Sequence, residues 1–156
     1  MKKQKGFSLI ELLIVVAIIL IIAAIAIPNL MRSKMAANEA SAVASVRTLN
    51  TAAVTYSATY GIGFPALLTN LAPAAAATAA SADLIDSVLS TGTKSGYTFA
   101  LAGIAAVGGV VPGYSVNSNP VKQDTTGIRY FFSDQSAVIR QAIGAAATVA
   151  STPIGN

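Results

Sequence analysis

The sequence predicts an α+β protein with a long N-terminal α-helix, whose second half packs on a domain, and a small antiparallel β-sheet. Three observations lead to this fold class. An apolar run fills most of the first thirty residues, a stretch without glycine or proline follows it, and strand-like runs separated by turn residues occupy the last third. A chain of 156 residues has room for one modest domain and one long accessory element.

The composition indicates a surface that does not face water alone. Charged residues make up 10% and hydrophobic residues 54% of the chain, whereas about a quarter of the residues of an ordinary soluble domain are charged. A membrane or other copies of the protein should therefore cover part of it. Lys2, Lys3 and Lys5 supply three of the ten basic side chains, which leaves seven basic against six acidic ones. Nucleic-acid binding is therefore not predicted.

The absence of cysteine and histidine excludes several kinds of chemistry. The common zinc sites, thiol nucleophiles and imidazole triads all need these side chains. No phosphate loop and no nucleophile beside a base is found either, so we predict no enzyme and no cofactor. Asp124 and Asp134 are two isolated carboxylates, whereas calcium prefers about six to eight oxygen ligands, so no metal site is predicted.

Residues 7–28 have the length and composition of a membrane-spanning helix. A helix from Phe7 to Ile27 would span roughly 30 Å, about the thickness of the hydrocarbon core of a bilayer. Three lysines precede the apolar run, and Arg32 and Lys34 follow it. The positive-inside rule weakly favours a cytoplasmic N-terminus and an exported C-terminal domain.

Glu11 is the lone acidic group in this apolar segment. A charged side chain deep in a bilayer costs about 2.5–3.5 kcal/mol, so it normally indicates a function and a partner. The alternative is that Glu11 lies near the interface and reaches water without any role.

Two further interpretations of the N-terminal segment remain open. Ala24-Ile25-Ala26 resembles the cleavage site of an ordinary secretory signal. Cleavage after Ala26 would release a secreted binding protein that begins at Ile27. The segment is also compatible with an uncleaved anchor that holds an enzyme at the membrane.

Gly6-Phe7-Ser8-Leu9-Ile10-Glu11-Leu12-Leu13 resembles the cleavage and methylation motif of type IV prepilins and of the pseudopilins of type II secretion. The resemblance implies that residues 1–6 are a leader. It also implies that a membrane aspartyl prepilin peptidase cuts between Gly6 and Phe7 and methylates the new amine of Phe7.

The same resemblance implies a structural subunit of an extracellular type IV pilus, a helical homopolymer that adheres or serves motility. The precursor would reside in the bacterial inner membrane, with the lipid bilayer and the pilus assembly machinery as partners. The assembled subunit would lie at the cell surface. Pseudopilins share the motif, so a pseudopilin of a type II secretion or DNA-uptake system is the alternative.

Cleavage would create a positively charged amine on Phe7, one helical turn from Glu11. The amine and the carboxylate form a natural ion pair, within one chain or between chains packed in a bundle. Desolvation offsets much of the attraction, so setting the register between subunits is the expected benefit. Phe7 and Glu11 are therefore the predicted assembly residues.

Residues 29–60 are predicted to continue the helix as an amphipathic segment. One apolar stripe recurs at three- or four-residue steps: Val43, Val46, Leu49, Ala53, Tyr56 and Tyr60. Pro28 lacks a backbone donor, so we expect a kink there or local unwinding near residues 20–27.

Residues 61–95 are predicted to form a connecting loop with short helices. Ser81 is the expected N-cap of one such helix. Asp83 and Asp86 would be charges in its first turn, favoured by the helix dipole.

Residues 96–156 are predicted to form the antiparallel sheet of three or four strands and a C-terminal tail. The strand-like runs are Gly96–Ala106, Gly113–Asn117, Ile128–Ser133 and Ala137–Ala142. Asp134-Gln135-Ser136 is the expected hairpin loop between the last two. The resemblance implies that this sheet packs on the second half of the helix, although the cysteine pair near the C-terminus of many pilins is missing.

Overall fold

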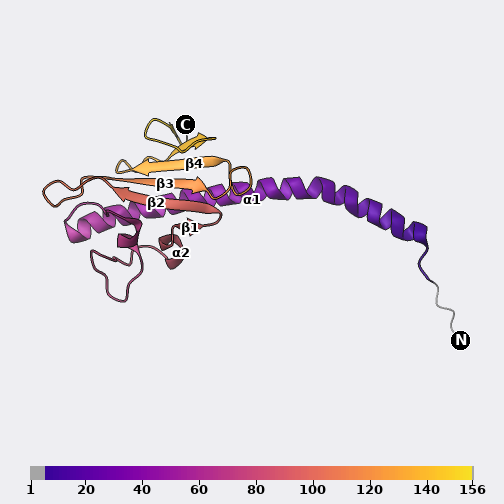
Figure 1. Cartoon of the computed structure of the whole chain (residues 1–156), viewed down its shortest axis with the longest axis horizontal. Helices are drawn as coiled ribbons and strands as arrows, with labels where there is room; N and C mark the ends of the chain where they lie inside the picture. Colours follow the sequence, from indigo (N-terminus) through magenta and orange to yellow (C-terminus); the bar gives the residue numbers. More distant parts are fainter. Residues whose placement is uncertain (1–5, 156) are drawn as a thin grey trace. The chain divides into compact units, whose positions relative to one another are not determined.

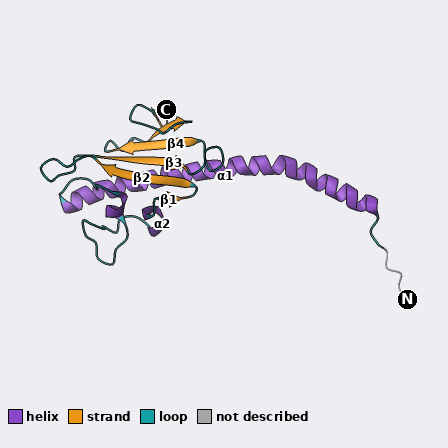
Figure 2. Ribbon diagram, viewed as in Figure 1, coloured by secondary structure: helices purple, strands orange, loops and turns teal. Residues whose placement is uncertain are grey.

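The computed structural model describes residues 6–155 and contains one long helix, short helical turns and one antiparallel sheet (Figures 1 and 2). The chain divides into two compact units, residues up to 34 and residues from 35 onward. Residues 2–5, which hold the three lysines of the expected leader, lie outside the described part.

Helix α1 runs from Leu9 to Tyr60, 52 residues, and confirms the predicted long helix. Its interior contains no glycine, and Gly61 follows its last residue with a φ of 67°. Glycine adopts this left-handed conformation at no steric cost, which makes it the usual residue after a helix C-terminus. The helix therefore ends directly before Gly61, the first glycine after Leu9.

Pro28 lies inside α1, and residues on both sides of it are helical. Proline has no N–H for the carbonyl four residues earlier. The side-chain amide of Asn29 donates a 3.0 Å hydrogen bond to the carbonyl of Ile25 close to this gap. Residues 20–27 remain helical, so the local unwinding expected there is absent, while a kink at Pro28 stays a prediction.

The sheet has six strands in the order β1-β2-β3-β4-β5-β6, each antiparallel to its neighbours. Four are longer: β2 (Tyr97–Gly103), β3 (Tyr114–Pro120), β4 (Arg129–Asp134) and β5 (Arg140–Ile143). Two short edge strands, β1 (Thr93–Lys94) and β6 (Thr152–Pro153), complete it. The predicted count of three or four strands was therefore too low, because two-residue edge strands show no periodicity of their own.

A hairpin loop follows β4 as predicted, but it spans residues 135–139 rather than 134–136. The N–H of Ala137 donates to the carbonyl of Asp134 at 2.9 Å, and the N–H of Ser136 donates to the side chain of Asp134 at 2.9 Å. Asp134 is itself the last residue of the strand, and β5 begins only at Arg140.

The core lies between the second half of α1 and one face of the sheet. Val46, Leu49, Ala53 and Tyr56 of the predicted stripe are buried, while Val43 and Tyr60 are partly buried against them. Alternate residues of the strands face this stripe: Tyr97, Phe99, Leu101, Tyr114, Val116 and Phe131. Period-2 alternation on the strands thus meets helical periodicity on α1 in one hydrophobic core.

The connection between α1 and the sheet contains a 3₁₀ turn, η1 (Leu68–Leu71), and a short helix, α2 (Ser87–Ser90). Asp86 caps α2 by accepting a 2.9 Å hydrogen bond from the N–H of Leu89. The expected cap at Ser81 is wrong, and so is the placing of Asp83 in the first turn, where it instead has a φ of 53°.

The error at Ser81 has a physical reason. Residues 82–85 donate their backbone N–H groups to carbonyls of residues 70–72 at 2.9–3.2 Å, so they cannot form a helical turn. The hydroxyl of Ser81 donates to the carbonyl of Ala72 at 2.9 Å. Backbone hydrogen bonds between residues 82–85 and residues 70–72 therefore prevent the helical turn that the local sequence favours.

Candidate processing and assembly site

Ser8 and Glu11 cap the N-terminus of α1. The Ser8 hydroxyl accepts a hydrogen bond from the N–H of Ile10 at 3.3 Å. In return, the Glu11 carboxylate accepts one from the N–H of Ser8 at 2.8 Å. This reciprocal arrangement is a variant of the capping box in which the Ser8 hydroxyl accepts from the second helical residue, and it satisfies donors that the first turn of a helix leaves free.

The capping box separates the predicted scissile bond from the helix. Gly6, Phe7 and Ser8 have no helical structure, and the side chain of Phe7 is 89% exposed. A side chain added at Gly6 would meet no atom within 4 Å. The fold of this chain therefore does not itself require glycine at this position.

The side chain of Glu11 reaches back along the chain to Ser8, the residue that follows Phe7. Its carboxylate lies on the backbone N–H of Ser8, one peptide unit from the nitrogen that cleavage would release. Pro28 lies farther along α1 and takes no part in this arrangement. Ser8 was not among the residues expected at this site, although the Ser-x-x-Glu spacing is a known signature of a capped helix N-terminus.

The first half of α1 exposes aliphatic side chains all around the helix. Residues 9–34 contain no buried side chain, and the exposed ones include Ile14, Ile18, Ile21 and Ile25. By length and composition, α1 can cross a membrane. A helix that is hydrophobic on every side is normally covered by lipid or by other protein. Cleavage after Ala26 would cut through the middle of this helix.

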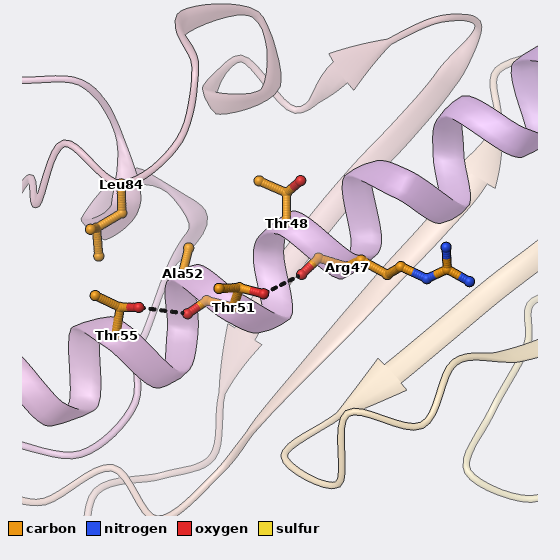
Figure 3. Close-up of a pocket in the computed structure, with 6 residues that line it drawn as sticks. All are labelled: Arg47, Thr48, Thr51, Ala52, Thr55 and Leu84. Atoms are coloured by element: carbon orange, nitrogen blue, oxygen red, sulfur yellow. Dashed lines mark hydrogen bonds between the residues drawn. The ribbon is translucent and has the colours of Figure 1, made fainter.

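The second half of α1 presents a polar face on the side away from the core. Thr48, Thr51, Thr55 and Thr59 each donate a hydrogen bond to the carbonyl four residues earlier, at 2.8–3.1 Å. Figure 3 shows part of this face, where Arg47, Ala52 and Leu84 join three of the threonines around a shallow depression of about 340 Å³. The threonine hydroxyls donate within the helix, so this face offers fewer free hydrogen-bond donors than its composition suggests.

A partly buried ion pair fastens α1 to the start of β4. Glu39 is only 6% exposed, and its carboxylate accepts hydrogen bonds from the N–H of Ile128 at 2.8 Å and of Arg129 at 3.1 Å. The Arg129 guanidinium donates to the same carboxylate at 2.7 Å. Burial alone would raise the pKa of Glu39, but these hydrogen bonds outweigh it and hold the pKa below its usual value.

A second buried polar contact joins α1 to the middle of the sheet. The amide of Asn50 donates to the Ser133 hydroxyl at 2.8 Å and accepts from the Tyr114 hydroxyl at 3.1 Å. Burial raises the pKa of Tyr114 to about 12. This contact fixes the register of the helix on the sheet. A shift of the helix would leave the buried polar groups of Asn50, Ser133 and Tyr114 without hydrogen-bond partners.

Acidic side chains do not gather in the part of the chain that the structure describes. No group of three or more potential metal ligands occurs within residues 6–155. Asp134 uses one carboxylate oxygen to accept from Ser136 in the hairpin loop. Asp124 lies in another turn, where its φ is 61°.

Comparison with known proteins supports the resemblance of the N-terminal segment. The model of the prokaryotic N-terminal methylation motif matches residues 1–27. The N-terminal segment of this chain is therefore similar to that of type IV prepilins, and the α+β fold agrees with this similarity.

The curated relatives are pilus proteins. The type IV wide pilus major component PilA4 of Thermus thermophilus is 59% identical over 39 residues, which cover 25% of this chain and 30% of that protein. Two fimbrial proteins of Pseudomonas aeruginosa are each 57% identical over 53 residues, or 34% of either chain. The chain thus spans about a third of the length of the relatives it matches, and no solved structure matches it significantly.

Proposed function

We propose that this protein is a structural subunit of an extracellular type IV pilus. The observation that carries the proposal is a helix with exposed aliphatic side chains on all sides, which Ser8 and Glu11 cap at its N-terminus and whose second half packs in a folded head. Such a helix needs to be covered throughout the life of the protein. Lipid covers it in the inner membrane before assembly, and sister helices cover it in the filament.

Processing by a prepilin peptidase is the first step of the proposed function. The enzyme cuts the peptide bond between Gly6 and Phe7, removes residues 1–6 and methylates the Phe7 amine. The exposed, non-helical backbone of residues 6–8 supports this step, since a peptidase binds its substrate in an extended form. The fold leaves open space around position 6, so we attribute the small residue there to the peptidase, which approaches the backbone closely.

Glu11 is the proposed counter-charge for the amine that cleavage creates. Its carboxylate already accepts from the backbone next to Phe7, so the helix N-terminus presents a negative charge where the positive one appears. In a water-excluded filament centre, the amine of one subunit pairs with Glu11 of the same or a neighbouring subunit. The pair sets the axial register at which a new subunit enters the filament, with the pilus assembly machinery of the inner membrane as partner.

The relatives favour a pilus over a secretion pseudopilin, since all three carry pilus or fimbrial names. The test is to image the surface of cells with and without this gene by electron microscopy, and then after complementation with the unaltered gene. We expect filaments that disappear with the gene, return on complementation and bind an antibody against the head. Unchanged filaments in the deletion strain, or no filaments in any strain, would refute the proposal.

A further inference from the structure

Two exposed cations follow the apolar half of α1. Arg32 and Lys34 lie five and seven residues after Ile27, the last residue of the apolar run. At a rise of about 1.5 Å per residue, they lie about 7 to 11 Å beyond that run along the helix axis. The polar headgroup layer on each side of a bilayer is about 5 to 7 Å thick. The two cations therefore lie at the outer border of this layer when residues 7–27 fill the hydrocarbon core.

The side chains of these two residues point back toward the membrane. Every Cα–Cβ bond of an α-helix tilts toward the N-terminus of the helix, and here that is the direction of the apolar run. Lysine and arginine also lay their aliphatic stems along apolar surface while the charged group stays in a polar layer. Leu30 and Met31, which are 69% and 47% exposed, provide such surface beside the stems. Both charges can therefore reach the level of the lipid phosphates.

No anion within residues 6–155 neutralises these two cations. Neither Arg32 nor Lys34 takes part in the ion pairs of this part of the chain. No acidic residue occurs within four positions of either one, which is the spacing at which helical neighbours pair. Glu39, the next acidic residue along the chain, is held by Arg129. The anion that these cations attract therefore comes from outside the described chain.

The positions of the two cations around the helix indicate what carries this anion. Residues two positions apart in an α-helix lie about 200° apart around its axis, so Arg32 and Lys34 project from nearly opposite sides. A protein docked on one side of the helix would neutralise one of them, whereas lipid headgroups surround a single spanning helix and neutralise both. The positive-inside rule does not account for the pair, because it favours few cations at the exported end.

We propose that Arg32 and Lys34 bind the phosphates of anionic phospholipids in the leaflet on the exported side of the membrane. The contact fixes the depth of α1 in the bilayer before assembly. It is broken when the subunit leaves the lipid for the filament. This inference rests on the proposed function, which places the unassembled pilus subunit in the inner membrane, and it adds the class of lipid that holds the subunit there.

Photochemical cross-linking to lipid headgroups tests the contact. The full-length protein is reconstituted in phosphatidylcholine vesicles that contain a small amount of phosphatidylglycerol with a photoreactive headgroup. A parallel sample contains phosphatidylcholine with the same reactive group. Mass spectrometry of peptides then gives the ratio of phosphatidylglycerol to phosphatidylcholine adducts on residues 29–36. We expect this ratio to be well above one in the unaltered protein.

The double variant Arg32→Gln, Lys34→Gln removes both charges. A basic residue near a membrane surface contributes about 1 kcal/mol, so the loss of two corresponds to roughly 30-fold weaker binding. We expect the adduct ratio on residues 29–36 to fall by about this factor. Residues 1–6 keep their three lysines in every variant, so their adducts serve as an internal reference.

Two control variants separate charge and position from other effects. The swap Arg32→Lys, Lys34→Arg keeps both charges and should keep the ratio. Arg47→Gln removes an exposed arginine from the second half of α1 and should also keep it. Thermal unfolding of the head should be the same in all variants, because all three positions are exposed.

Several outcomes would overturn the lipid contact. One is an equal ratio in the unaltered protein and the double glutamine variant, and another is a loss in the swap as large as in that variant. An equal loss in Arg47→Gln would assign the preference to the net charge of the chain. Loss of filaments from the double glutamine variant with an unchanged ratio would assign the cations to an acidic protein instead.

Imaging of cells for filaments separates this inference from the proposed function. Filaments on the cells together with no preference for phosphatidylglycerol would refute the lipid contact and leave the pilus subunit intact. A clear preference for phosphatidylglycerol together with no filaments in any strain would refute the pilus subunit and leave the lipid contact intact.

Discussion

Glu11 combines two roles that substitutions can separate, a hydrogen-bond acceptor for Ser8 and a negative charge. Glu11→Gln keeps an oxygen acceptor for the capping box and removes the charge. If the pair with the Phe7 amine is fully buried, losing its partner costs about 3–5 kcal/mol. We expect cleaved, folded subunits in the inner membrane and few or no filaments, measured by immunoblotting of fractions and by microscopy.

Glu11→Ala, which removes both roles, is the companion variant. It should assemble no better than Glu11→Gln if the charge matters. Normal filaments from Glu11→Gln together with none from Glu11→Ala would assign the assembly role to the helix cap and contradict the ion-pair mechanism.

Glu39 should make the stability of the head depend on pH. The folded state lowers the pKa of this carboxyl from a usual value of 4.5, so its contribution is present at neutral pH and is lost as the pH falls through the folded-state value. Thermal unfolding of the protein in detergent, followed by circular dichroism from neutral to acidic pH, measures this loss. Glu39→Gln should be less stable at neutral pH and show a shallower decline on acidification, and identical pH profiles would contradict this account.

At the scale of elements, the buried stripe of α1 should account for the stability of the head. Leu49→Ala removes a fully buried side chain and should lower the free energy of unfolding by about 2–5 kcal/mol. Val54→Ala, on the exposed side of the same helix, should change it by less than about 0.5 kcal/mol. Urea unfolding measures both, and equal losses would mean that α1 does not pack on the sheet through this stripe.

The extents of the elements were largely predictable, whereas the start of α2 and the two edge strands were not. Helical periodicity up to Gly61 and alternation within β2 and β3 are local patterns that the buried core also shows. Helix α2 begins only after Asp86 because the backbone of residues 82–85 is paired with residues 70–72, and the six-strand count likewise depends on pairing between strands. The cap formed by Ser8 and Glu11 is local, and the Ser-x-x-Glu spacing could have predicted it. Glu11 was instead interpreted only as a charge in an apolar segment.

At the scale of the whole molecule, processing should define the mature N-terminus. Mass spectrometry of the mature protein should find Phe7 first, with one methyl group. Ile27 as the first residue would indicate ordinary signal cleavage, and an intact Met1 would indicate a permanent anchor.

Gly6→Leu should accumulate as uncut precursor with a normally folded head, since position 6 has open space around it and the restriction comes from the peptidase.

The class of protein and the outline of the fold follow from the order of residues along the chain. The motif at residues 6–13, the apolar helix and the alternating strands are encoded within windows of a few turns, where neighbours in sequence are neighbours in space. The Glu39–Arg129 pair and the Asn50 contact with Tyr114 and Ser133 are different. Each joins residues far apart in sequence, because a side chain acquires its partner and its burial only when α1 and the strands pack together.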